Sequence, residues 1–240
     1  MAEKNSSKRS FVLVHGAWQG GWCYESVVAR LRAMGHVVYA PTLTGLAERA
    51  QHLSPEIGLA THVQDVAGLI ERECLEDIVL CGHSYGGMVV TGVVQALPTR
   101  IKALVYLDAV VPDAGCCLID YLDDRKGIDA LTIQPEGLYI APIPASVFGV
   151  SADKQAWVDS RSTLQPRRTF EENLPAVDAR DAVSRKVYVL ATEYNMPMFR
   201  RFADARRDRP DWTVIDLPYG HELMVDAPDE VVNVLLGAAV

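Results

Sequence analysis

A pentapeptide near the middle of the chain constrains the fold more than any other feature. Gly82-His83-Ser84-Tyr85-Gly86 follows the short apolar run 77–81 and precedes 87–96, a proline-free run with many small and β-branched residues. A G-x-S-x-G between a strand and a helix is typical of a nucleophile elbow, a turn so sharp that only glycines fit beside the serine. The pattern predicts that the Ser84 hydroxyl projects from a sheet edge as a nucleophile. The alternative is an ordinary Gly/Ser turn.

Strand and helix patterns alternate along most of the chain. Short apolar runs predict strands over residues 10–15, 36–40, 77–81, 101–107, 186–191 and 212–217. Apolar residues at helical spacing predict helices over 24–34, 87–96, 198–207 and 229–236. One more helix is expected to start at Thr61, whose hydroxyl would form a capping box with Gln64. This alternation is typical of an α/β fold, a mostly parallel sheet with helices on both faces.

Residues 112–184 break the alternation. They contain many glycines and prolines with only short apolar groups between them. We expect this segment to be an inserted cap over the carboxyl edge of the sheet, with residues 10–111 and 185–240 forming the core. The polar residues 1–9 are expected to be a disordered tail.

Composition excludes several classes of protein. The 240 residues suit one α/β domain with an insertion, and the net charge of -8 argues against binding to nucleic acid. No apolar run reaches the length of about 18 residues that a membrane span needs, and the first ten residues lack the apolar core of a signal peptide. We therefore expect a cytoplasmic protein with no membrane partner. The sequence leaves open whether it forms a homodimer.

The cysteines do not form a disulfide or metal-binding pattern. Their number, five, is odd, and two of them are adjacent: Cys23, Cys74, Cys81, Cys116 and Cys117. No pair has zinc-finger spacing, and the histidines do not cluster near them. We expect reduced thiols, no metal and no organic cofactor.

A serine nucleophile needs a base, an acid that orients the base, and a site for the developing oxyanion. In elbow-containing folds these groups follow the order Ser, acid, His along the chain. His221 stands in a short loop between the last predicted strand and the last predicted helix, which is the place expected for the base. A surface loop histidine is the alternative. His83, inside the elbow, is expected to be a packing residue.

The chain resembles the α/β-hydrolase superfamily, and specifically the compact branch of plant methylesterases, hydroxynitrile lyases and bacterial esterases. The resemblance is carried by Phe11 to Trp18, Gly21-Trp22-Cys23, Gly35-His36, Gly82 to Gly87 and Gly220-His221. These motifs span nearly the whole chain outside the cap. They are specific for the fold and much less so for the substrate.

The resemblance implies an oxyanion hole made by the backbone N–H groups of Ala17 and Tyr85. Gly16, just before Ala17, would let the backbone approach a ligand closely. Preorganised amides directed at an oxyanion contribute a few kcal/mol to transition-state binding. Trp18 is expected either to line the substrate pocket or to pack against the sheet.

The position of the acid departs from the pattern of the superfamily. Most members carry the acid after the strand that follows the cap. Here that segment, 187–197, has Glu193 as its only carboxylate. Asp108 ends the preceding strand, a position that some haloalkane dehalogenases use, and ligand-facing groups of open α/β sheets gather at such ends. We therefore predict Asp108 as the acid, with Glu193 as the alternative. Asp226 is expected to be an N-cap before Ala227-Pro228.

The cap should determine the substrate. Besides Trp18, its aromatic residues Tyr139, Phe148 and Trp157 are candidates to wall an apolar pocket, although burial in the cap's own core is the alternative for each. The arginines alternate with acidic residues and are expected to lie on solvated faces.

These inferences predict a cofactor-free serine hydrolase that cleaves a small or medium carboxylic ester, carbamate or amide through an acyl-enzyme. A hydroxynitrile lyase is one alternative. The resemblance weighs against it, because plant lyases carry threonine where this chain has Gly16 and lysine where it has Glu222. A non-catalytic hydrolase-like binding protein is the other alternative.

Overall fold

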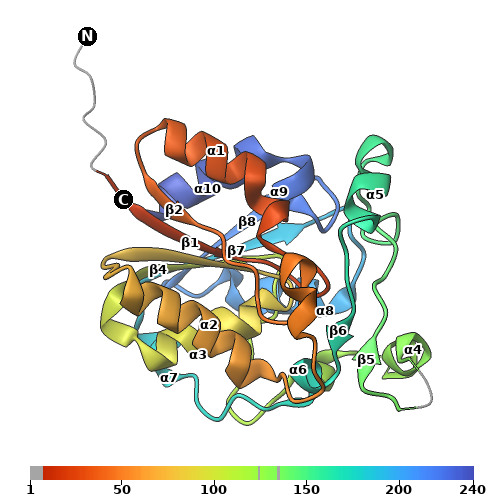
Figure 1. Ribbon diagram of the computed structural model, residues 1–240. Helices are drawn as coiled ribbons and strands as arrows, with labels where there is room; N and C mark the ends of the chain where they lie inside the picture. Colours follow the sequence, from red (N-terminus) through yellow and green to blue (C-terminus); the bar gives the residue numbers. More distant parts are fainter. Residues whose placement is uncertain (1–7, 124, 134–135) are drawn as a thin grey trace.

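The computed structural model describes residues 8–123, 125–133 and 136–240. Their main element is a six-stranded sheet in the order β2-β1-β3-β4-β7-β8, in which all neighbours are parallel (Figure 1). Its strands are β1 (Ser10–Val14), β2 (Val37–Tyr39), β3 (Ile78–His83), β4 (Ile101–Leu107), β7 (Arg185–Ala191) and β8 (Trp212–Leu217). The predicted α/β class is confirmed. Most of the expected tail, residues 1–7, lies outside the described residues.

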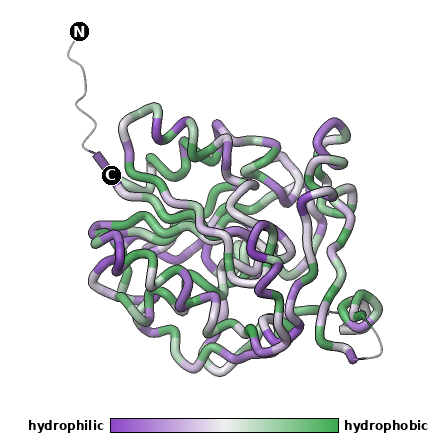
Figure 2. The backbone as a smooth tube through the Cα atoms, viewed as in Figure 1, coloured by the Kyte–Doolittle hydropathy of each residue, from purple (hydrophilic) through white to green (hydrophobic). Residues whose placement is uncertain are grey.

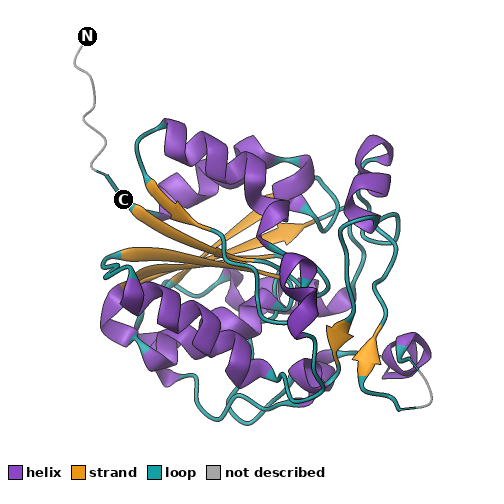
Figure 3. Cartoon of the chain, in the orientation of Figure 1, coloured by secondary structure: helices purple, strands orange, loops and turns teal. Residues whose placement is uncertain are grey.

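Helices cover both faces of the sheet, as Figure 3 shows. One face carries α1 (Glu25–Ala33), the short α9 (Leu223–Asp226) and α10 (Pro228–Ala238). The other carries α2 (Leu59–Arg72), α3 (Gly86–Ala96) and α8 (Pro197–Arg207). Among the described residues, no helix is both long enough and apolar enough to cross a membrane.

Alternation along each strand divides the core into two layers. In β1, Val12 and Val14 pack with α2 and α3, whereas Phe11 and Leu13 pack with α1 and α10. Successive side chains of a strand point to opposite faces, so a strand buried on both sides reads as a continuous apolar run. Figure 2 shows these hydrophobic strands at the centre of the molecule. The apolar runs in the sequence follow from this arrangement.

Residues 112–184 connect β4 to β7. They contain a 3₁₀ turn η4 (Leu118–Tyr121), α4 (Arg125–Leu131), β5 (Tyr139–Ile140), α5 (Ala152–Asp159), β6 (Gln165–Pro166), α6 (Arg168–Glu171) and α7 (Asp178–Ala182). β5 and β6 pair antiparallel, and they lie with α4 and α5 beyond the carboxyl ends of the sheet strands (Figure 1, right). The end of the segment turns back beneath the sheet, where α7 contacts α3.

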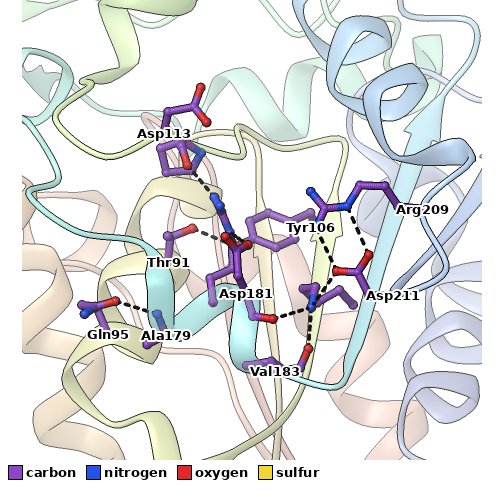
Figure 4. A network of polar contacts seen from close by, with 12 residues as sticks. Thr91, Gln95, Tyr106, Asp113, Ala179, Asp181, Val183, Arg209 and Asp211 are labelled. Atoms are coloured by element: carbon purple, nitrogen blue, oxygen red, sulfur yellow. Dashed lines mark hydrogen bonds and ion pairs between the residues drawn. The ribbon is translucent and has the colours of Figure 1, made fainter.

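A polar network fixes that return to the sheet (Figure 4). The buried Lys186 ammonium donates to the carbonyls of Asp181 and Val183, at 3.1 and 2.5 Å, and pairs with Asp211 at 3.2 Å. Gln95 of α3 accepts the N–H of Ala179 at 3.1 Å. A buried cation is costly unless it is paired and hydrogen-bonded, and these contacts satisfy Lys186.

The start of α2 differs from the prediction. The helix begins at Leu59, two residues before Thr61, and Gly58 is its N-cap. The Thr61 hydroxyl accepts the backbone N–H of Gly58 at 3.4 Å, so Thr61 is the third residue of the helix. The expected pairing with Gln64 is wrong because Thr61 is not the N-cap: it occupies the third helical position, from which its own side chain reaches back to Gly58.

Candidate active site

Ser84 lies on the turn between β3 and α3, with a φ of 52° in the left-handed region. The flanking glycines are required by close packing. A Cβ on Gly86 would lie 2.7 Å from the carbonyl oxygens of Val14 and His15, and one on Gly82 would lie 2.5 Å from that of Gly86. Only glycine fits such contacts, and a non-glycine residue at positive φ is strained. The tight turn presents the Ser84 side chain at the carboxyl edge of the sheet.

His221 and Asp108 meet at that edge from different elements. Asp108 follows β4, and His221 lies in the loop between β8 and α9. His221 Nδ1 lies 2.6 Å from Asp108 Oδ2, while Oδ1 of the same carboxylate accepts the Ala191 N–H at 3.1 Å. With the Nδ1 proton donated to Asp108, Nε2 is the ring nitrogen free to accept a proton.

Both members of this pair are buried. Burial lowers the pKa of the His221 imidazole, and burial raises the pKa of the Asp108 carboxyl. The Ala191 N–H opposes the rise at Asp108, because a donor stabilises the carboxylate. The imidazole is therefore neutral at rest.

Glu193, the alternative acid, is placed elsewhere. Its side chain is exposed, and its backbone N–H donates to Tyr219 at 3.1 Å. Asp226 differs from its expected role. Instead of capping α10, it accepts the backbone N–H of Ser151 at 3.0 Å, and the nearby Lys154 ammonium lies 3.3 Å from it.

The two amides expected in the oxyanion hole flank Ser84. Among the described residues, neither the N–H of Ala17 nor that of Tyr85 donates to a protein acceptor. The Gly16 carbonyl, on the same peptide as the Ala17 N–H, lies 2.7 Å from Nδ1 of the buried His15. Leu43 donates its N–H to His15 Nε2 at 3.0 Å, so the proton of a neutral His15 is on Nδ1 and is donated to Gly16.

The protonation of His15 agrees with this assignment. Burial lowers the pKa of His15 to about 4, so the ring is neutral at physiological pH. His62 is in the same state for the same reason, with its pKa lowered to about 4, and its Nδ1 lies 2.9 Å from the Tyr85 hydroxyl. Each residue that carries an expected oxyanion donor is thus fixed by a neutral, buried histidine.

A cavity of about 70 Å³ is lined by Ser84, His221, Ala17 and Tyr85. The rest of its wall is apolar or aromatic and comes from several elements: Trp18, Val110, Leu118, Leu122, Ile128, Ile143, Phe148, Phe170, Tyr194, Met196, Met198 and Phe199. No Lys, Arg, Asp or Glu of the described residues lines it.

Two of the four aromatic residues proposed for the pocket line it, and two do not. Trp18 and Phe148 are part of the wall, with ring centroids 6.2 Å apart. Trp157 packs edge-on against Trp22 at 5.0 Å. Tyr139 lies half-buried in β5 opposite Pro166. Neither residue lines the cavity, and Trp157 is not buried in the cap's own core either, because its partner Trp22 belongs to the core of the sheet domain.

The sequence analysis missed the part of the wall that follows β7. Tyr194, Met196 and Phe199 line the cavity, and the rings of Tyr194 and Phe199 lie 4.6 and 4.9 Å from the His221 ring. In the sequence this segment is notable first for its single carboxylate, Glu193. Its aromatic and methionine content, just after a strand at the carboxyl edge, was the available signal.

Two neighbours of the triad are also buried. His83 Nε2 donates to the His221 carbonyl at 3.0 Å, so this packing residue also holds the His221 loop. Glu222, next in the chain, is 1% exposed, and burial raises its pKa to about 7. Gln19 partly offsets this rise, because its side chain hydrogen-bonds Glu222.

Other parts of the described structure do not form a comparable site. A larger open groove of about 520 Å³ lies between β8 and α10, lined in part by Lys186, Asp211 and Glu230, and contains no predicted site residue. Within the described ranges, no group of three or more His, Cys, Asp or Glu side chains is arranged to hold a metal ion.

A parallel sheet with an elbow serine, a histidine–aspartate pair and free amides at its carboxyl edge defines the class of α/β-hydrolases. Sequence comparison agrees. A model of the alpha/beta hydrolase family matches residues 11–234, so this chain belongs to that family. A carbendazim hydrolyzing esterase of Nocardioides sp. (strain SG-4G) is 44% identical over 237 residues, covering 94% of this chain and 98% of that protein.

More distant relatives extend the comparison. Salicylic acid-binding protein 2 of Nicotiana tabacum is 27% identical over 205 residues, covering 77% of this chain and 79% of that protein. An extracellular alpha/beta-hydrolase from a Paenibacillus species has the same fold, with a TM-score of 0.83 and 23% identity over 96% of this chain and 98% of that one. The predicted family and branch are confirmed, and the chain is a hydrolase of the carboxylesterase type.

Proposed function

We propose that the chain hydrolyses small, neutral carboxylic esters and carbamates through an acyl-enzyme on Ser84. The observation that carries the proposal is the 2.6 Å contact between His221 Nδ1 and Asp108. It lies beside a cavity lined by Ser84 and by Ala17 and Tyr85, whose amides have no protein acceptor among the described residues. A serine becomes nucleophilic only when a base, its orienting acid and oxyanion donors surround it.

In this mechanism Nε2 of His221 takes the Ser84 proton as Oγ attacks the carbonyl carbon. Asp108 keeps the imidazole in the required tautomer and stabilises the imidazolium that forms. The N–H groups of Ala17 and Tyr85 bind the oxyanion, and His221 then protonates the leaving oxygen or nitrogen. Water, activated by the same histidine, releases the acyl group and restores Ser84.

The cavity wall supports a neutral, apolar substrate. A charged group buried among Val110, Phe148 and Phe199 would lose its hydration without gaining a partner. The volume of about 70 Å³ favours small acyl or alkoxy groups, and the flexible Met196 and Met198 can yield to larger ones. The similarity to a carbendazim hydrolyzing esterase makes aromatic carbamates, carbendazim included, the first substrates to test.

The test compares matched aromatic substrates. Methyl esters and carbamates of a neutral ring should be cleaved, and the same compounds carrying a ring carboxylate should react far more slowly. Ser84→Ala should lose activity by up to about 10⁶-fold in kcat. Hydrolysis that persists in Ser84→Ala, or a preference for the anionic substrates, would contradict the proposal.

We also propose a compartment and an assembly state for the chain. None of the cysteines, which all lie in the described part of the chain, forms a disulfide. Unpaired thiols favour a reducing compartment such as the cytoplasm. A homodimer is compatible with this site, which takes every residue named above from one chain.

A further inference from the structure

One segment of the chain binds every polar group of Trp18. The backbone N–H of Trp18 donates to Gln165 Oε1 at 2.9 Å, and its carbonyl accepts the N–H of Thr163 at 2.8 Å. The indole Nε1–H donates to the carbonyl of Ile140 at 3.2 Å. All three partners belong to the segment between β4 and β7, more than a hundred residues away in sequence.

Gln165 is held in this contact by its surroundings. Its side chain is fully buried, and its strand β6 is paired with β5 so that Gln165 lies opposite Ile140. Gln165 and Ile140, which are paired across β5 and β6, therefore bind Trp18 at two places: Gln165 at the backbone N–H and Ile140 at the indole.

The orientation of the Gln165 amide follows from its second partner. Thr169 donates its hydroxyl hydrogen to the Pro166 carbonyl at 2.6 Å, so Thr169 Oγ1 accepts a hydrogen bond from Gln165 Nε2 at 2.7 Å. This leaves Oε1 as the atom that faces the Trp18 N–H. The amide cannot flip without losing both hydrogen bonds.

Trp18 needs such restraint because its backbone has a φ of 65°. A non-glycine residue in this region is strained by about 1 to 3 kcal/mol and keeps the conformation only when its surroundings impose it. Trp18 directly follows Ala17, whose own N–H is on a peptide held by His15 through Gly16. With the peptides on both sides of Ala17 fixed, the direction of the Ala17 N–H is fixed too.

We propose that Gln165 is a positioning residue for the oxyanion hole: by binding the Trp18 N–H it holds Ala17 so that its amide faces the reacting carbonyl. The inference rests on the proposed function, because it takes the Ala17 N–H as an oxyanion donor. It makes the inserted segment a determinant of transition-state binding as well as a wall of the cavity.

The proposal predicts a kinetic signature. Without the Gln165 acceptor, Trp18 relaxes toward negative φ and the Ala17 amide turns away from the oxyanion. The apolar wall is unchanged, so KM should stay within about twofold while kcat falls. Loss of one oxyanion donor costs about a hundredfold to a thousandfold in kcat, and misalignment should cost about tenfold to a hundredfold.

Gln165→Met tests this, because methionine has a similar length and no acceptor for the Trp18 N–H. Rates are expressed per active site titrated by acylation, so that unfolded protein does not count. Thr169→Val keeps the side-chain volume but removes the acceptor of the Gln165 amide. It should lower kcat less than Gln165→Met does, again with little change in KM. Gln155→Met is the matched control, since Gln155 donates to the Val150 carbonyl and is not among the hydrogen-bond partners of Trp18 in the described structure.

The carbonyl stretch of the acyl-enzyme supplies a readout that general destabilisation would not move. Weaker hydrogen bonding to the carbonyl oxygen should shift its infrared band to higher wavenumber in Gln165→Met and leave it in place in Gln155→Met. A wild-type kcat in Gln165→Met, or a loss of kcat with an unshifted band, overturns the inference. Because the acyl group must be on Ser84 for this measurement, failure of the proposed function would be recognised separately by its absence.

Discussion

Three residues of the site have a backbone conformation that side chains disfavour. Trp18, Ser84 and Asp108 have φ values of 65°, 52° and 43°. Strain of this kind persists where the surroundings impose it, and it gathers at functional sites. The three lie in turns or bends that follow β1, β3 and β4 at the carboxyl edge of the sheet, where a side chain or amide must leave the strand direction to meet the others.

The role of Asp108 can be tested against the other carboxylate near the site. Asp108→Asn keeps the size of the side chain but favours the wrong tautomer of His221, so kcat should fall by up to about 10⁴-fold. Glu193→Gln should stay near wild type, because Glu193 is exposed. The measurement is steady-state kinetics of both variants on one ester. The opposite order of effects would place the acid after β7.

The pH profile tests the state of His221. Burial lowers the pKa of this imidazole below its ordinary value of about 6.5, so the ring stays neutral as the pH falls from 8 to 6. We expect kcat/KM to hold its plateau through this range and to fall only at lower pH. A half-maximal point at pH 6.5 to 7 would show that burial does not shift the base.

At the scale of elements, Asp226 joins the inserted segment to the histidine loop. It follows His221 in α9 and accepts hydrogen bonds from the backbone and hydroxyl of Ser151, at 3.0 and 2.5 Å. Just before Ser151, the carbonyl of Phe148 accepts the His221 N–H at 2.8 Å. Gly149 and Gly220 also pack so closely that a Cβ on Gly220 would collide with the Gly149 carbonyl. These contacts join the part of the cavity wall at Phe148 to the loop that carries the base.

Asp226→Ala should loosen this connection. It removes two hydrogen bonds and the contact with Lys154, all partly buried, and should lower the free energy of unfolding by about 2 to 3 kcal/mol. Asp204→Ala, which breaks an exposed ion pair with Arg207, should cost less than about 1 kcal/mol. Urea unfolding followed by circular dichroism measures both. Equal effects of the two changes would show that the contacts of Asp226 contribute no more to the free energy of unfolding than a surface ion pair does.

The sequence predicted the sheet elements well and the inserted segment poorly. The apolar run of β4 is continuous because the strand is buried on both faces, so it could be recognised alone. In contrast, β5 and β6 have two residues each, and β6 includes a proline. Such short pieces form through contacts with distant residues such as Trp18, which no local pattern records.

The same distinction applies to the site. Ser84, His221 and Asp108 could be located because strand ends at one sheet edge converge. Gln165 could not, because its importance comes from its contact with Trp18 across the chain. Tyr194 and Phe199 had a local signal, their place just after β7, but only the structure shows their rings against His221. Trp157 is an aromatic residue of the kind that lines pockets, but its ring packs against Trp22 instead.

At the scale of the whole molecule, buried histidines should make the fold sensitive to acid. Burial lowers the pKa of His15, His62, His83 and His221, so each is neutral in the folded protein below pH 6.5, where the unfolded chain is protonated. The unfolded state then binds more protons, and the stability contributed above pH 6.5 is lost as the pH falls.

Glu222 acts in the opposite direction. Its pKa is raised to about 7, so between about pH 4.5 and 7 the folded state holds a proton that the unfolded chain has released. The buried Asp108 carboxyl, whose pKa is also raised, acts in the same direction as Glu222. Four histidines then oppose two carboxyls, and the net difference is up to two protons, or about 3 kcal/mol of unfolding free energy per pH unit. Urea titrations at pH 7.5, 6.0 and 5.0 should show steadily decreasing stability. A urea midpoint that does not change with pH would mean that burial does not lower the pKa of these histidines.

The central claim, that Ser84 is the nucleophile, is tested most directly by locating the covalent intermediate. Intact-protein mass spectrometry after reaction with a fluorophosphonate should show one adduct per chain. Peptide mapping should place it on Ser84 because, among the serines that the structure describes, only this one has a base and oxyanion donors beside it. Ser84→Ala should remain unlabelled and inactive. An adduct on another residue, or equal labelling and ester hydrolysis by Ser84→Ala, would contradict the account.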